Sequence, residues 1–159
     1  MENIFKITPC TRADIPFVAD VYQKNVEALH GNLRDFETWD RLLTDEKSSY
    51  YIVRTDKPVA WFRIDFADAF ELGMLQVEPK YHRQGIGRYI VSVVESIADE
   101  KGFKQVVIHT TDDNIPAQKL YSECGYSLVE IGPCTTADGK NRIGYTYQKD
   151  LQKKWKTMN

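Results

Sequence analysis

The chain has 159 residues, which suits one α/β domain with a substantial buried core. Hydrophobic residues at 42% and charged residues at 28% are ordinary for a globular protein, and no apolar run approaches membrane-spanning length. The net charge of −2 argues against a nucleic-acid-binding protein with a broad basic surface. Three widely spaced cysteines, Cys10, Cys124 and Cys134, predict reduced thiols in the cytoplasm. The histidines show no metal-ligand spacing with them, so no metal is expected.

The first half of the chain is predicted to hold one strand, two helices and three further strands. Apolar residues from Ile15 to Val26 recur at helical spacing, and Gly31 ends that helix. Gly73 predicts a bulge or a close backbone approach in the last of these strands. Trp39 in the second helix is interpreted as a core residue rather than a pocket wall. The predicted segments are strand Ile4–Thr8, a helix from Ile15, helix Arg34–Leu43, and strands Tyr50–Arg54, Val59–Phe66 and Phe70–Val77.

The second half is predicted to hold a long helix, a strand, a short helix and a hairpin. Apolar residues from Ile86 to Ala98 lie on one helical face, and Gly102 is a plausible C′ residue after Lys101. No repeat, low-complexity tract or linker interrupts the chain, which predicts one domain over residues 1–159. The predicted segments are the helix up to Lys101, strand Gln105–Thr110, helix Pro116–Glu123, and a hairpin of Ser127–Ile131 with Arg142–Gln148.

The turn before the long helix, Arg83-Gln84-Gly85-Ile86-Gly87-Arg88, has the character of a phosphate-binding loop. A helix start exposes unpaired N–H groups with partial positive charge, and glycines let an anion approach the backbone. Two arginines add full charges beside it. The alternative is an ordinary turn whose glycines serve only tight packing. Ile90 stands where the dinucleotide fingerprint needs a small residue, and the chain holds no P-loop sequence.

Two segments together resemble the GNAT superfamily of N-acetyltransferases. Val77-Glu78-Pro79 leads into Gly85-Ile86-Gly87, as in that family's coenzyme A-binding segment, and His82 departs from the usual Arg or Gln. Asn114, Ala117, Tyr121 and Gly125-Tyr126 match a second family motif, so the resemblance covers residues 71–131. It implies an α/β (α+β) fold, a single GNAT-like domain with a central mixed, mostly antiparallel sheet of about seven strands flanked by about four helices.

The resemblance also implies acetyl-coenzyme A as co-substrate and an amine acceptor attacked in a ternary complex. Tyr121 is then the general acid that protonates the departing thiolate, with a core tyrosine as the alternative. Asn114 is expected to contact the pantetheine arm, to cap its helix, or both. The implied coenzyme A-binding residues are Leu75, Gln76, Val77, Arg83, Gln84, Gly85, Ile86, Gly87, Arg88, Asn114 and Tyr121.

The base and the acceptor are less closely specified. Glu71 is the best placed carboxylate to deprotonate an incoming amine, with Asp65, Asp68 and His109 as alternatives. A small-molecule or peptide amine fits, and a homodimer through the free edge of the final hairpin is compatible. A non-catalytic acyl-coenzyme A sensor of the same fold is the competing function. A nucleotide-phosphate binder does not account for the segment around Tyr121.

Overall fold

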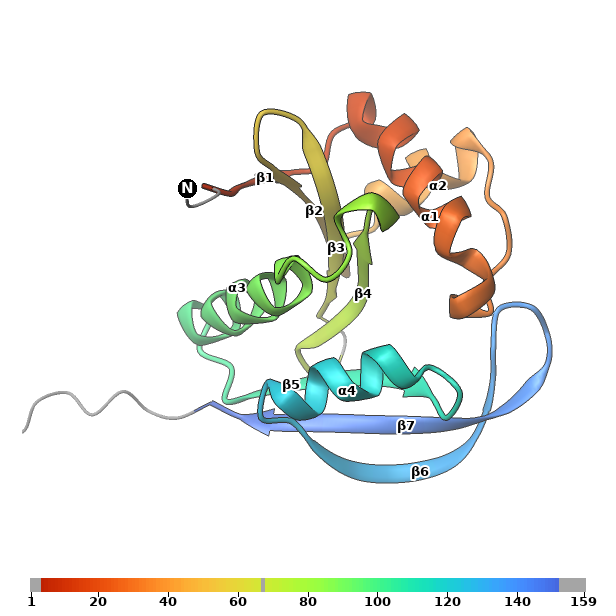
Figure 1. Cartoon of the computed structure of the whole chain (residues 1–159), viewed down its shortest axis with the longest axis vertical. Coiled ribbons are helices and arrows are strands. Elements are labelled where there is room, and N and C mark those ends of the chain that lie inside the picture. The colour runs from red at the N-terminus through yellow and green to blue at the C-terminus, as the bar shows by residue number, and fades with distance from the viewer. Residues whose placement is uncertain (1–3, 67, 152–159) are drawn as a thin grey trace, which may run out of the picture.

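The structure is a computed structural model that describes residues 4–66 and 68–151. The described residues form a seven-stranded sheet in the order β1-β2-β3-β4-β5-β7-β6, with four α-helices packed on it (Figure 1). Only the β4–β5 pair is parallel, so the predicted mixed, mostly antiparallel sheet is confirmed. The strands are β1 (Lys6–Pro9), β2 (Ser48–Arg54), β3 (Pro58–Asp65), β4 (Glu71–Val77), β5 (Gln105–Thr111), β6 (Ser127–Thr135) and β7 (Asn141–Asp150). The helices are α1 (Ile15–Leu29), α2 (Phe36–Leu43), α3 (Ile86–Glu100) and α4 (Ile115–Glu123), with 3₁₀ turns η1 (Arg12–Asp14) and η2 (Pro79–Tyr81).

Several predicted boundaries shift for identifiable reasons. Helix α2 begins at Phe36 rather than Arg34, because Asp35 is extended and its carboxylate accepts the Thr38 N–H at 2.8 Å as an N-cap. Strand β1 lies at residues 6–9, later than predicted, where it pairs with residues 51–54 of β2. The final hairpin is longer than predicted, since its ladder continues to the Thr135–Asn141 pair beside the turn.

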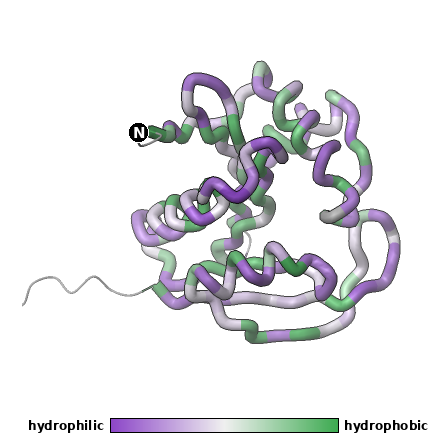
Figure 2. The backbone as a smooth tube through the Cα atoms, in the orientation of Figure 1, coloured by the Kyte–Doolittle hydropathy of each residue, from purple (hydrophilic) through white to green (hydrophobic). Residues whose placement is uncertain are grey.

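The two faces of the sheet carry different helices and different cores. Trp61 and Phe62 are adjacent on β3 and both fully buried, and they point to opposite faces because strand side chains alternate. Trp61 packs with α1 and α2, and Phe62 packs with α3. Trp39 lies fully buried in the first cluster, so its ring is a core residue as predicted, while its indole Nε1 has no hydrogen-bond partner among the described residues. Figure 2 shows that hydrophobic residues follow the central strands of the sheet, between these helices.

Strands β4 and β5 separate soon after they meet. They pair only at Glu71–Val107 and Leu72–Ile108, and beyond that point β4 has no partner on this side (Figure 1). The β3–β4 register shifts between Arg63 and Ile64, which confirms the predicted bulge at Gly73. A Cβ at Gly73 would stand 2.2 Å from Asp65 Oδ2, so the side chains of β3 lie across this glycine. The divergence leaves a backbone edge of β4 open.

None of the helices within residues 4–66 and 68–151 is both long and apolar enough to cross a membrane. Strand β6 forms one edge of the sheet and exposes Leu128, Val129 and Ile131. Pairing of this edge with a second copy stays a prediction.

Candidate active site

A cleft of about 440 Å³ lies where β4 leaves β5. This volume falls within the range of small-molecule sites. It brings together every coenzyme A-binding residue predicted from the sequence except Gln84, together with Asn25 and Leu29 of α1. The predicted residues that line the cleft are Leu75, Gln76, Val77, Arg83, Gly85, Ile86, Gly87, Arg88, Asn114 and Tyr121.

The turn into α3 is shaped for an anion at one end of this cleft. Arg83 and Gly85 both have left-handed backbones, with φ of 63° and 82°. Gly85 is the N-cap of α3 and offers no capping side chain, so the first N–H groups of the helix stay available. Arg88 lies 3.4 Å from Glu123, but both side chains are about half exposed, which makes that ion pair weak. The arrangement provides a positively charged, donor-rich cradle.

The two residues that follow Gly85 act through packing as well as backbone. Ile86 is the first residue of α3 and packs its side chain into the core, so it offers its backbone N–H at the helix start. Gly87 brings α3 against α4, since a Cβ there would stand 3.2 Å from Leu120 and 3.9 Å from Leu75. A larger residue at position 87 would therefore push the walls of the cleft apart.

The end of β4 is held by two side chains that the sequence did not single out for this role. His82 Nε2 lies 2.9 Å from the Val77 carbonyl. The histidine that departs from the family pattern therefore fixes the turn after β4 to the last residue of that strand. Asn25 Nδ2 donates to the same carbonyl at 3.3 Å and to Gln76 Oε1 at 3.1 Å. A polar residue on the sheet-facing side of α1, three positions after Tyr22, was the signal available for Asn25.

Asn114 and Tyr121 lie two turns apart on α4 and both line the cleft. Asn114 Oδ1 accepts the Ala117 N–H at 3.3 Å, so the residue caps its helix while it borders the cavity. Tyr121 is 8% exposed, with its ring 5.9 Å from that of Tyr147. Burial raises the pKa of Tyr121 to about 12, and its phenol is therefore protonated at physiological pH.

None of the candidate bases lines the cleft, and those that lie on strands, Glu71, Asp65 and His109, are on the α1/α2 face of the sheet. Glu71 Oε1 is 3.4 Å from His109 Nε2, and His109 Nδ1 is 3.0 Å from Thr146 Oγ1. The structure thus joins two residues that the sequence offered as alternatives. Asp65 is engaged by Arg63 at 2.9 Å and by Ser48 at 2.7 Å, which removes it as a free base, and Asp68 is exposed in the β3–β4 turn. Within the described ranges, no group of three or more His, Cys, Asp or Glu side chains has the arrangement of a metal site.

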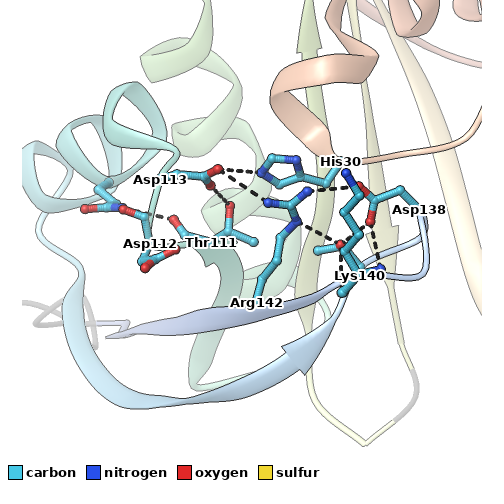
Figure 3. Close-up of polar contacts among 9 residues, drawn as sticks. His30, Thr111, Asp112, Asp113, Asp138, Lys140 and Arg142 are labelled. Carbon is cyan, nitrogen blue, oxygen red and sulfur yellow. Dashed lines mark hydrogen bonds and ion pairs between the residues drawn. The ribbon is translucent and has the colours of Figure 1, made fainter.

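A polar network joins three loops beside Asn114 (Figure 3). His30 Nε2 at the end of α1 lies 2.7 Å from Asp113, whose pKa is lowered by hydrogen bonds from Thr111 and His30. Arg142 of β7 lies 3.9 Å from the same carboxylate and donates to Asp138 at 2.9 Å. The β6–β7 turn is thereby tied to the α1–α2 loop. These residues are scattered along the sequence, and no local pattern marked them as a group.

Comparison with known proteins identifies a family and relatives with similar sequences. The chain matches the family model described as "Acetyltransferase (GNAT) family" over residues 15–126. "Probable N-acetyltransferase 14" of Xenopus tropicalis is 30% identical over 83 residues, which cover 52% of this chain and 36% of that protein. "GCN5-related N-acetyltransferase 7, chloroplastic" of Arabidopsis thaliana is 32% identical over 79 residues, covering 50% and 28%. The match therefore spans about a third of the length of these relatives.

Solved structures share the fold at low sequence identity. A spermidine N-acetyltransferase from Vibrio cholerae, in complex with CoA and spermine, superposes with a TM-score of 0.80 at 13% identity, over 92% of this chain and 95% of that one. The ribosomal-protein-S18-alanine N-acetyltransferase of Escherichia coli gives 0.74 at 18% identity, over 98% and 99%. Because the family model covers more than half of the chain, the resemblance seen in the two motifs is confirmed, and this protein belongs to the GNAT family of acetyltransferases.

Proposed function

We propose that this chain moves an acetyl group from acetyl-coenzyme A to an amine by direct attack in a ternary complex. The observation that carries the proposal is the cleft at the β4–β5 divergence, bordered by the anion cradle at Gly85 and by the buried phenol of Tyr121. A sensor needs the cradle but no proton donor for a leaving group. The combination favours a transferase.

The cleft residues fit the chemistry of coenzyme A. The start of α3, with Arg83 and Arg88 beside it, suits the pyrophosphate through N–H groups and charge. The open edge of β4 from Gly73 to Val77 can pair with the amides of an extended pantetheine arm, as an added strand would. A main-chain N–H near Val77 is then the candidate donor to the oxyanion.

The step needs one proton removed and one supplied. The amine nitrogen attacks the thioester carbonyl carbon, the C–S bond breaks, and Tyr121 gives its proton to the departing sulfur. Most amines arrive as ammonium at neutral pH and must first lose a proton. We assign that removal to Glu71, with His109 beside it and 56% exposed as the exit for the proton to solvent.

Tyr121 and Glu71 lie on opposite faces of the sheet. Tyr121 packs in the α3/α4 core, as do Leu72 of β4 and Ile108 of β5. Because side chains alternate along a strand, Glu71 and His109, which precede and follow these two residues, point to the other face, where they contact each other. The two substrates would therefore enter from opposite faces and meet in the gap between β4 and β5. The names of the structural neighbours include small-molecule and protein acceptors, and both classes remain within the proposal. The free thiols of Cys10, Cys124 and Cys134 are compatible with the proposed cytoplasmic location.

The test is a calorimetric titration with acetyl-coenzyme A and coenzyme A, combined with a thiol-release assay over an amine panel. We expect saturable binding of both nucleotides and amine-dependent release of thiol. Binding without release for any amine would favour the sensor. Absence of binding would overturn the cleft assignment itself.

A further inference from the structure

We propose that the interior between α1, α2 and the β2–β4 surface, beneath the α1–α2 loop, is a subsite for a carboxylate of the acceptor. The acceptor would then be an amine that also carries an acid group. This inference rests on the proposed acetyl transfer and names the class of its acceptor. It would not hold for a polyamine.

The first observation is a surplus of hydrogen-bond donors on this face. Among the described residues, the buried side-chain N and O atoms that have no partner all belong to it. Indole and guanidinium groups can only donate, so they cannot satisfy one another. The surplus therefore calls for an acceptor from outside the chain. The atoms are Tyr22 Oη, Arg34 Nη1, Trp39 Nε1, Trp61 Nε1 and Gln76 Nε2.

Four of these donor groups belong to side chains that pack together in one cluster. The guanidinium carbon of Arg34 lies 4.7 Å from the ring centre of Tyr22 and 4.9 Å from that of Trp39. The rings of Trp39 and Trp61 are 5.7 Å apart. Tyr22, Trp39 and Trp61 are each at most 1% exposed. The four side chains thus belong to one aromatic cluster, in which the three rings are closed to solvent and Arg34 stacks on two of them.

The second observation is the charge of Arg34. The other partly buried arginines, Arg54, Arg63 and Arg142, each form an ion pair with an aspartate. Arg34 is also partly buried, yet it has no carboxylate partner in the part of the chain that the structure describes. The aromatic rings compensate part of its charge, and a bound anion would compensate the rest.

A carboxylate matches this donor set better than a cation or a neutral group. Its two oxygens accept about four hydrogen bonds and fit the planar fork of a guanidinium. Arg34 and Arg63 both act as nearby cations on the Tyr50 hydroxyl, whose pKa is nevertheless raised by burial. Because Asp65 compensates Arg63, Arg34 is the cation beside this phenol without a carboxylate partner among the described residues, and its charge would repel a polyamine.

The subsite adjoins the reaction site through β4. Met74 packs against the cluster, and Trp61 pairs in register with Gln76 of the cleft. An acceptor whose acid group is held by Arg34 would therefore present its amine toward the strand that borders the cleft.

The loop that carries Arg34 is fixed in place before any ligand arrives. His30 at its start pairs with Asp113, and the Asn32 amide donates to the Ala137 carbonyl (Figure 3 shows the His30 side). Gly31 lies directly over the Tyr22 hydroxyl, where a Cβ would stand 2.2 Å from the oxygen. A preorganised loop spends less binding energy on ordering.

The competing explanation is that the indole N–H groups point at neighbouring ring faces. Trp39 and Trp61 are nearly perpendicular, at 86°, so an edge of one can approach the face of the other. In that case the cluster is only a core, and removal of the Arg34 charge would change stability without changing acceptor choice.

The first experiment compares acceptors that differ only in the acid group. Lysine with cadaverine, tyrosine with tyramine, and histidine with histamine are assayed for thiol release. In any pair that the enzyme acetylates, we expect kcat/KM to be about 10- to 100-fold higher for the amino acid than for the amine that lacks the carboxylate. Arg34→Gln should reduce this ratio of the two kcat/KM values to about one. Arg12→Gln is the matched control, because Arg12 also stacks on an aromatic ring but is exposed and paired with Asp40. An equal ratio for acids and amines, or no effect of Arg34→Gln on it, overturns the subsite and leaves acetyl transfer standing.

The second experiment does not depend on turnover. N-acetyl-lysine, N-acetyl-tyrosine and N-acetyl-histidine are titrated against their decarboxylated counterparts, followed by tryptophan fluorescence in a Trp155→Phe background that isolates Trp39 and Trp61. A saturable fluorescence change that occurs with an acid but not with its decarboxylated counterpart, and that is lost in Arg34→Gln, supports the subsite even if no amine is acetylated. No change with any acid overturns it. Phosphoethanolamine competing better than β-alanine would overturn the carboxylate in favour of phosphate.

Discussion

The two faces of the sheet satisfy their polar groups in different ways. On the α3/α4 face, the Tyr126 hydroxyl donates to Glu95 at 3.0 Å, and Lys149 donates to Glu95 and to the Cys124 carbonyl, each at 2.9 Å. On the α1/α2 face, buried donors stand without acceptors around Arg34. Within the described residues, the buried polar side chains of the α3/α4 face have hydrogen-bond partners, whereas several on the α1/α2 face have none.

The difference reflects how each side binds. The α3/α4 side offers a ligand backbone groups, from the start of α3 and the edge of β4, and its side chains can pair internally. The α1/α2 side offers side-chain donors, which must stay unpaired to be used. We infer that the first face serves a constant substrate and the second selects a variable one.

The strongest test of this comparison uses the two adjacent core residues of β3. Trp61→Ala and Phe62→Ala each remove a fully buried aromatic side chain, and each should lower the free energy of unfolding by about 3–5 kcal/mol. At a temperature where both variants are folded, only Trp61→Ala should also raise the acceptor KM. Denaturant unfolding and steady-state kinetics measure the two effects. Equal KM changes in both variants would erase the functional contrast between the faces.

Tyr121→Phe tests the chemistry assigned to the α3/α4 face. Loss of the proton donor should lower kcat about 100-fold with little change in the affinity for coenzyme A. Tyr126→Phe is the matched control, since Tyr126 is also buried but directs its hydroxyl to Glu95. Stopped assays and calorimetry separate turnover from binding. Full turnover in Tyr121→Phe would leave Tyr121 as a packing residue.

Gly73→Ala tests the point where the two faces meet. The new Cβ would collide with Asp65 and Arg63, and the required shift should cost about 1–2 kcal/mol of stability and raise the acceptor KM. Gly132→Ala is the control, because no atom lies within 4 Å of the Cβ it would add. Thermal unfolding of both variants provides the measurement. A Gly73→Ala protein of unchanged stability would show that the Arg63 and Asp65 side chains can move away from the new Cβ without cost.

Charge reversal at the cradle tests the anion site. Arg83→Glu with Arg88→Glu should weaken coenzyme A about tenfold but leave pantetheine, which lacks the pyrophosphate, unaffected. Arg41→Glu, at an exposed arginine of α2, controls for net charge. Calorimetry at constant ionic strength gives the affinities. Equal losses for both ligands would contradict the cradle assignment.

The contrast between the faces also explains what the sequence could predict. The cradle and the Tyr121 helix are each built from residues close together in the chain, so local patterns located them. Asn25 reaches the end of β4, and Trp61 packs against Trp39, only because α1 and α2 pack on β2–β4. No local sequence pattern indicates that packing. The Glu71–His109 contact likewise depends on the parallel register of β4 with β5.

The smallest effect concerns the β6–β7 turn that ties the two halves together. Hydrogen bonds from Thr136 and Arg142 hold the pKa of Asp138 well below its ordinary value. A depressed pKa contributes stability that is present above the unfolded value near 3.8 and is lost as the pH falls below it. Asp138→Asn should therefore lower the unfolding temperature slightly at pH 7, by an amount that stays constant down to about pH 5 and shrinks below about pH 4.

Asp112→Asn is the matched control for this change, since the ion pairs of the described residues at this turn involve Asp113 and Asp138 and not Asp112. Thermal unfolding of the three proteins between pH 3 and pH 7 measures the differences. A deficit in Asp138→Asn that persists at pH 3 would assign the effect to hydrogen-bond geometry instead of charge. Because the same turn anchors the loop of Arg34, a charge effect should be accompanied by a loss of acid-over-amine preference. The hairpin would then support the selective face without contacting the acceptor.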